Sequence, residues 1–184
     1  MYGLVNKGLE DLIRARHGDA TWERVCQEAG IELETFLAMS SYPDEVTFRI
    51  VGAACRQLGE EAAALLEAFG EHWIRYTAQE GYGELFALGG GDLVSMLGNL
   101  DRLHGRIATA FPKFRMPHFE CIELGPGRLR LVYRSERAGL APMVVGLVRG
   151  LGAYFSTPVA IQQVARREDT GVDEFEITHG EAAA

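Results

Sequence analysis

The chain is poor in cysteine and lacks a long apolar run. Its three cysteines, Cys26, Cys55 and Cys121, lie far apart and form no CxxC pair, which argues against a disulfide framework and a structural zinc site. No apolar stretch is long enough to span a bilayer, and Glu10 and Asp11 interrupt the segment where a signal peptide would be apolar. We therefore expect a cytoplasmic protein with reduced thiols and no membrane partner.

Basic residues are outnumbered by acidic ones. The chain has 18 Lys and Arg against 26 Asp and Glu, which gives a formal net charge of −8. This balance argues against nucleic acid or an anionic membrane as the main partner. The 184 residues, 47% of them apolar, suit one domain with a substantial core. We expect that domain to span residues 1–184 and to leave no room for an output module.

The pattern of apolar residues changes along the chain. The first half shows helical spacing, as in residues 44–59 and 92–111, and glycines such as Gly30 and Gly59 follow the helices. Two pairs of strands follow, with a buried-looking helix between them, and each pair is expected to form a β-hairpin. We predict an α+β fold with an N-terminal helical part at about residues 1–65 and, at about 66–180, an antiparallel sheet with packed helices.

A histidine interrupts the apolar stripe of the helix at 92–111. The stripe repeats at three- and four-residue spacing and contains Leu93, Met96, Leu97, Leu100, Leu103, His104, Ile107 and Phe111. A lone histidine in such a stripe is more often a core residue bonded to a backbone carbonyl. A neutral imidazole among leucines is also what a five-coordinate haem iron needs as its protein ligand. This stripe alone does not decide between the two.

The stretch RLRLVYRSER at 128–137 carries an unusual alternation. On an extended strand one face would present Leu129, Leu131, Tyr133, Ser135 and Arg137. Such a face is apolar at one end and offers two hydroxyls and a guanidinium at the other. It would suit haem, an apolar disc with two carboxylates on one edge, since charge-assisted bonds of this kind are strong. The alternative is a solvated edge strand with an ordinary polar face.

Together these features resemble a known family, the haem nitric oxide/oxygen-binding (H-NOX) domain that also serves as the sensor of soluble guanylate cyclase. The similarity begins with MYGLVNKGLEDLI and continues through TWERV, FGEHWIRYT and GYGELF. It then runs through LDRLHGRI, FPKFRMPHFEC and LVYRSERAGLAPMVVGLVRGLG to the terminal hairpin. The diagnostic pieces are a histidine in the long helix and Tyr-x-Ser-x-Arg on the strand that follows.

The resemblance implies a haem b (iron protoporphyrin IX) buried between the helical part and the sheet. His104 matches the proximal ligand of the iron, and Tyr133, Ser135 and Arg137 match the clamp on the haem propionates. Pro117 matches the proline that presses on the porphyrin and distorts it, which its rigid ring suits. Further contacts with the cofactor are expected from Leu100 and Met116.

The residues expected around a bound gas are almost all apolar. They are Val5, Leu9, Trp73, Met143 and Leu147. In the family's oxygen binders a tyrosine on the helix after the clamp donates a hydrogen bond, and by alignment Met143 takes its place. Trp73 has an indole N–H, but bulk packing is its more expected role. We therefore predict a site that binds nitric oxide and carbon monoxide and discriminates against oxygen.

The resemblance also implies how binding becomes a signal. Nitric oxide would weaken or break the bond between iron and His104, so that the helix shifts and the porphyrin flattens away from Pro117. Gly105 follows the histidine; it either softens the helix where it must move or simply makes room for the macrocycle or a neighbouring helix. By analogy with stand-alone bacterial members, the partner would be a separate histidine kinase or a cyclic-di-GMP enzyme.

Two other classes of function fit parts of the sequence. His72, Trp73 and Arg75 on one helix suggest the acid and base groups of a haem peroxidase. Trp73 and His72 point about 100° apart on a helix, however, so both cannot face one haem. The second alternative is a haem-free pocket for another apolar carboxylate, such as a fatty acid, which would leave His104 without a role.

Overall fold

The computed structural model describes residues 1–32, 36–79, 86, 88–110 and 115–180. Within these ranges the chain forms helices and one four-stranded antiparallel sheet, which confirms the α+β prediction. The GYG stretch at 81–83 and the first residues of FPKFRMPHFEC, 111–114, lie outside the described residues. In the described part, no helix combines the length and apolarity needed to cross a bilayer.

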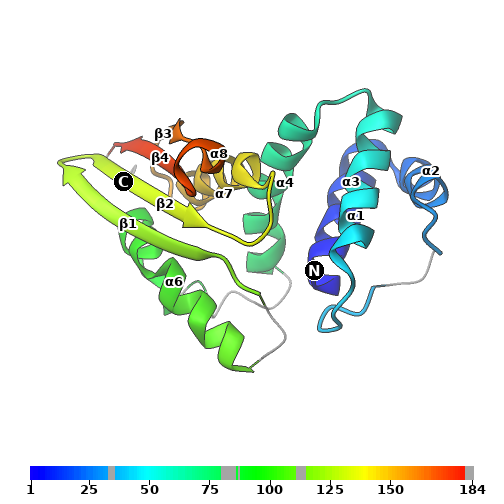
Figure 1. Ribbon diagram of the computed structural model, residues 1–184, viewed down its shortest axis with the longest axis horizontal. Coiled ribbons are helices and arrows are strands. Elements are labelled where there is room, and N and C mark those ends of the chain that lie inside the picture. The colour runs from blue at the N-terminus through cyan, green and yellow to red at the C-terminus, as the bar shows by residue number, and fades with distance from the viewer. Residues whose placement is uncertain (33–35, 80–85, 87, 111–114, 181–184) are drawn as a thin grey trace.

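Three helices form the N-terminal part, which lies to one side of the molecule (Figure 1). They are α1 (Gly3–His17), α2 (Asp19–Ala29) and α3 (Asp44–Leu58). As the sequence indicates, α2 and α3 end at Gly30 and Gly59, whose left-handed backbone (φ 62° and 68°) costs a glycine little. Their apolar faces meet in a buried cluster that includes Leu12, Ile13, Val25 and Ile50.

Helix α4 (Ala62–Gln79) connects this part to the rest of the molecule. Its Leu65 and Phe69 belong to the first buried cluster and its Ile74 to a second one, built with the sheet. The two clusters therefore meet along α4, whereas a division into parts at about residue 65 stays a prediction.

Helix α7 (Ala141–Tyr154) packs very closely against α4. A Cβ added at Gly70 would lie 2.3 Å from the carbonyl oxygen of Met143, and one at Gly146 would lie 2.0 Å from that of Glu67. Only glycine allows the two backbones to approach this far. This approach sets where α7 places its side chains relative to α4.

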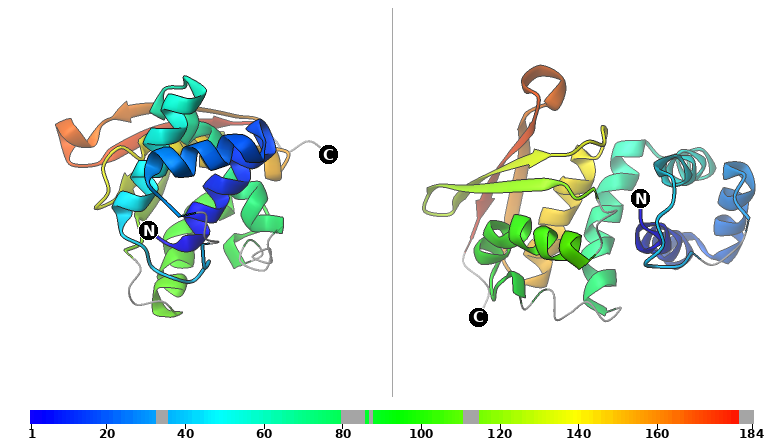
Figure 2. Two further views of the ribbon diagram at one scale, coloured as in Figure 1. Left: turned by 90° about the vertical axis from the view of Figure 1, so that its right-hand side faces the viewer. Right: turned by 60° about the horizontal axis from the view of Figure 1, so that its bottom comes forward.

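The sheet has the order β1-β2-β4-β3, and all its pairs are antiparallel. Its strands are β1 (His118–Gly125), β2 (Arg128–Arg134), β3 (Val159–Ala165) and β4 (Asp173–His179). Both expected hairpins are present, although the second also contains a short helix, α8 (Arg167–Thr170). Helix α6 (Leu93–Ala110) packs on β1, while α7 contacts β3 and separates the sheet from the N-terminal helices (Figure 2).

The expected strand at 128–137 is too long. Strand β2 ends at Arg134, so Ser135 and Arg137 do not continue its alternation. The physical reason lies in its neighbours, because β1 begins at His118, opposite Arg134, and β4 begins at Asp173, opposite Tyr133. Neither neighbour extends the ladder beyond Arg134, and the chain turns away from the sheet.

Candidate functional site

His104 lies on α6 where the burial of the apolar stripe changes. In the first half of the helix, Leu93, Met96 and Leu97 are each only 1% exposed. In the second half, the stripe residues Leu100, Leu103, His104 and Ile107 are half-buried. The described residues therefore cover the stripe fully at one end and partly at the other.

The His104 ring has the properties of a ligand-ready imidazole. Its Nδ1 is buried and has no hydrogen-bond partner among the residues that the structure describes. Burial lowers the pKa of His104 to about 4, and neighbouring Asp101 offsets this only in part. The ring is therefore neutral near pH 7. Among the described residues, His104 Nδ1 therefore does not bond to a backbone carbonyl, as it would in an ordinary core histidine.

Phe119 connects His104 to Tyr133. The rings of His104 and Phe119 have centroids 5.4 Å apart, and those of Phe119 and Tyr133 are 5.2 Å apart. Phe119 on β1 stands opposite Tyr133 on β2 in the register of the sheet. The imidazole and the phenol, 29 positions apart in the sequence, thus lie on either side of one phenylalanine ring.

Asp101 fixes α6 to the sheet one turn before His104. Its Oδ1 accepts a hydrogen bond from the backbone N–H of Phe119 and lies 3.1 Å from Nδ1 of His118. Sequence reasoning missed this residue. An aspartate three positions before a histidine indicates only that both can lie on one side of the helix, and it does not reveal the strand that they meet.

Tyr133, Ser135 and Arg137 come together although only Tyr133 is on the strand. Burial raises the pKa of Tyr133, an effect partly offset by a hydrogen bond with Ser135. The Ser135 Oγ accepts the backbone N–H of Arg137 at 3.1 Å. The local turn therefore links Ser135 to both Tyr133 and Arg137, and their role toward a cofactor stays a prediction.

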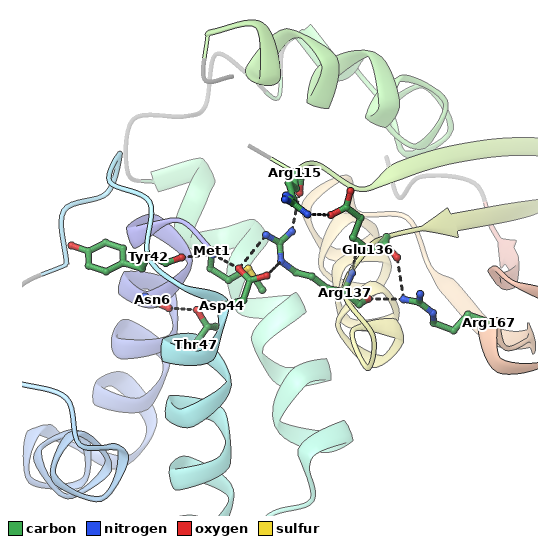
Figure 3. Close-up of polar contacts among 10 residues, drawn as sticks. Met1, Asn6, Tyr42, Asp44, Thr47, Arg115, Glu136, Arg137 and Arg167 are labelled. Atoms are coloured by element: carbon green, nitrogen blue, oxygen red, sulfur yellow. Dashed lines mark hydrogen bonds and ion pairs between the residues drawn. The ribbon is translucent and has the colours of Figure 1, made fainter. Parts of the chain in front are cut away.

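The guanidinium of Arg137 reaches the N-terminal part of the chain (Figure 3). Its Nε and Nη2 donate to Asp44 at 2.8 and 3.2 Å, and its Nη1 donates to the carbonyl oxygen of Arg115 at 2.8 Å. The ammonium group of Met1 also bonds to Asp44 and to the carbonyl oxygen of Tyr42. Within the described residues, three of the five guanidinium N–H groups are thus engaged.

Asp44, in the first turn of α3, is a second residue that sequence reasoning missed. Burial acts to raise the pKa of its carboxyl group, but the bonds from Arg137 and the Met1 ammonium outweigh burial and hold that pKa below its usual value. Asp44 and Arg137 are 93 positions apart, and an acidic residue at a helix start is common enough to give no signal.

The remaining expected cofactor contacts flank these groups. Leu100 is half-buried on α6, one turn before His104, and packs against the second buried cluster. Met116 and Pro117 are half-buried and directly precede β1. Their contact with a cofactor stays a prediction.

Three of the five expected gas-pocket residues line one cavity. Val5, Leu9 and Met143 border a cavity of about 230 Å³ between α1, α3, α4 and the start of α7. Trp73 and Leu147 are not among its lining residues. The Trp73 ring instead packs near Gly8 of α1 and has its centroid 5.8 Å from that of Phe69.

His72, the residue behind the peroxidase alternative, binds to the N-terminal part. Its Nε2 lies 2.8 Å from Oδ2 of Asp11 on α1, and its ring stacks on Tyr76. The imidazole therefore links α4 to α1.

Solved structures define the class of fold to which this arrangement belongs. The chain superposes with a TM-score of 0.87 on an H-NOX protein from S. oneidensis in the Fe(II)NO ligation state, at 20% identity and over 98% of this chain and 100% of that one. It superposes with a TM-score of 0.84 on an oxygen-binding H-NOX domain in its oxygen complex, at 18% identity and over 99% and 96% of the two chains. The fold is that of an H-NOX domain.

The sequence identifies the family. A family model described as Haem-NO-binding matches residues 2–163, and the chain belongs to this family. It is 30% identical over 182 residues to soluble guanylate cyclase gcy-35 from Caenorhabditis elegans, which is 97% of this chain and 26% of that protein. It is also 30% identical to gcy-37 from the same organism, over 92% of this chain and 24% of the relative. The chain thus spans about a quarter of the length of these relatives.

Proposed function

We propose that this protein is a haem-based sensor of nitric oxide. The observation that carries the proposal is the imidazole of His104. Its buried Nδ1 has no hydrogen-bond partner among the described residues, and its ring contacts Phe119, which in turn contacts the ring of Tyr133. When bound, ferrous haem b supplies an iron that accepts nitric oxide or carbon monoxide without further help from the protein.

The described residues fit such a cofactor on the histidine side. His104 would provide the ligand of the iron, since its low pKa keeps the lone pair free of a proton at pH 7. Leu100 on the same helix face is half-buried and can cover apolar macrocycle surface. Met116 and Pro117 would border the same face of the cofactor, and the rigid ring of Pro117 would oppose flattening of the porphyrin.

A second group of residues would hold the propionates. As far as the described residues show, Arg137 has two N–H donors beyond those given to Asp44 and Arg115. The Ser135 Oγ accepts the backbone N–H of Arg137, and its hydroxyl also bonds to Tyr133, so a propionate would compete for this hydroxyl. With Tyr133 beside it, the trio can bind carboxylates through charge-assisted bonds.

The gas side would be selective because it is apolar. The side chains of Val5, Leu9 and Met143 carry no hydrogen-bond donor for an oxygen ligand. The same cavity is also lined by Thr47, but its hydroxyl already donates to Oδ1 of Asn6 at 2.7 Å. Trp73 and Leu147 would add bulk from α4 and α7. We therefore expect nitric oxide and carbon monoxide to bind and oxygen to be rejected.

The output would pass through α6. Asp101 bonds this helix to β1 next to His104. A shift of α6, if His104 no longer bound the iron, would therefore alter this contact and the position of Pro117. The expected partner is a separate histidine kinase or a cyclic-di-GMP enzyme, by analogy with the family.

The absorption spectrum of the purified, reduced protein tests this proposal. Under argon it should show a five-coordinate ferrous haem, which changes with nitric oxide and with carbon monoxide but not on brief exposure to air. A stable oxygen complex would contradict the selectivity. A colourless protein that copurifies with a fatty acid would support the haem-free alternative, and rapid peroxide turnover with a dye substrate would support the peroxidase.

A further inference from the structure

Arg167 reaches across from α8 to the segment that carries Ser135 and Arg137. Its Nη1 donates to the carbonyl oxygen of Ser135 at 3.0 Å and to that of Arg137 at 2.9 Å (Figure 3). The side chain is half-buried. One guanidinium nitrogen thus holds two carbonyl groups on either side of residue 136.

Apart from the N–H of Arg137, which donates to Ser135 Oγ, the described residues give the backbone of this segment little other support. The ladder to β4 ends at Tyr133 and the ladder to β1 ends at Arg134. After that point the chain passes through Gly139, with φ 79°, before α7 begins. The two bonds from Arg167 therefore take the place that sheet hydrogen bonds would have if β2 continued.

The backbone of Arg167 is itself held in place. Asp173, only 5% exposed, accepts the backbone N–H of Arg167 at 3.1 Å and the side-chain amide of Gln163 at 2.8 Å. Gly171 closes α8 with a backbone bond to Arg167 at 2.8 Å. Asp173 also stands opposite Tyr133 in the sheet. Its buried carboxylate therefore holds the backbone of Arg167 close to Tyr133, the first residue of the Tyr-x-Ser-x-Arg motif.

We propose that Arg167 is a positioning residue that orients Ser135 and Arg137 toward a carboxylate of the cofactor and so slows the release of haem. This inference rests on the proposed function. Arg167 offers its donors to backbone carbonyls, so it acts on the cofactor through the two residues that it holds.

The test measures how fast haem leaves the ferric protein for an excess of apomyoglobin. We expect Arg167→Ala to speed this transfer about tenfold, because a charged donor to two carbonyls is lost. Arg166→Ala removes the same charge from an exposed neighbour and should leave the rate within about twofold of the unmodified protein. Arg167→Gln, which keeps one amide donor, should fall between them and serves as the test if Arg167→Ala does not fold.

An Arg137→Ala background separates positioning from general stability. If Arg167 acts through Arg137 and Ser135, Arg167→Ala should change the transfer rate in the Arg137→Ala background less than half as much as it does in the unmodified protein. A merely structural role predicts the same fold-change in both backgrounds, together with a lower urea midpoint for the haem-free protein, and that result would overturn the inference. So would an unchanged rate for Arg167→Ala. Failure of the unmodified protein to bind haem would instead refute the proposed function.

Discussion

The contact between Asp44 and Arg137 gives a prediction whose size follows from the structure. Asp44→Asn removes the charge that receives two guanidinium bonds. The side chains of Arg137 and Asp44 are 16% and 34% exposed, so the pair lies between exposed pairs, worth about 0.2–1 kcal/mol, and buried pairs, whose disruption costs about 3–5 kcal/mol. We expect a loss of about 1.5 kcal/mol of unfolding free energy.

Urea denaturation of the haem-free protein measures this loss. In thermal denaturation, a loss of that size should lower the Tm by about 3–6 °C for a chain of this length. A double-mutant cycle with Arg137→Gln isolates the pair from the Met1 ammonium, which also contacts Asp44. Glu45→Gln is the matched control, because Glu45 is exposed in the same first turn of α3 and forms no ion pair within the described ranges.

The pH dependence follows from the lowered pKa of Asp44. A carboxyl group with a lower pKa in the folded state contributes stability above its unfolded pKa of about 3.9. That contribution should be constant from pH 7 to pH 5 and should vanish as the pH falls through the folded pKa. A coupling energy below about 0.3 kcal/mol at pH 7, or equal losses for Asp44→Asn and Glu45→Gln, would refute the reasoning.

Three further predictions concern the helices around the site. Met143→Tyr places a phenol donor at the cavity and should give the reduced protein a stable oxygen complex in its absorption spectrum, which Met143→Phe should not. Gly105→Ala should raise the unfolding free energy by about 1 kcal/mol, since an added Cβ meets nothing within 4 Å among the described residues. It should also narrow the hydrogen-exchange difference between the unliganded and nitric oxide states; an unchanged difference would show that Gly105 does not soften α6. Gly146→Ala should lower the urea midpoint by the equivalent of at least about 2 kcal/mol, because its Cβ would lie 2.0 Å from the Glu67 carbonyl oxygen.

Local chemistry made the main elements predictable. Asp92 is a residue type that commonly begins a helix, and its Oδ1 accepts the N–H of Ser95 at 2.8 Å at the start of α6. Glycines in left-handed conformation end α2 and α3 where the sequence has them. The turn at Gly125–Gly127 joins β1 and β2 as a hairpin requires. Each of these features depends on residues within a few positions of one another.

What escaped prediction depends on distant partners. The end of β2 is set by where β1 and β4 begin, so no property of residues 128–137 alone could reveal it. Helix α8 has four residues between β3 and β4, and its first N–H is bonded by Asp173, six positions away on the next strand. The contact of Asp44 with Arg137 depends on how the N-terminal helices meet the sheet, which a pattern of apolar residues does not encode.

The most direct test of the account is the iron–histidine stretching band in the resonance Raman spectrum of the ferrous protein. The unmodified protein should show this band under argon and lose it on adding nitric oxide. His104→Ala should lack it from the start and regain it only when imidazole is supplied. If His104→Ala keeps the same band without added imidazole, another residue binds the iron and the central claim is wrong.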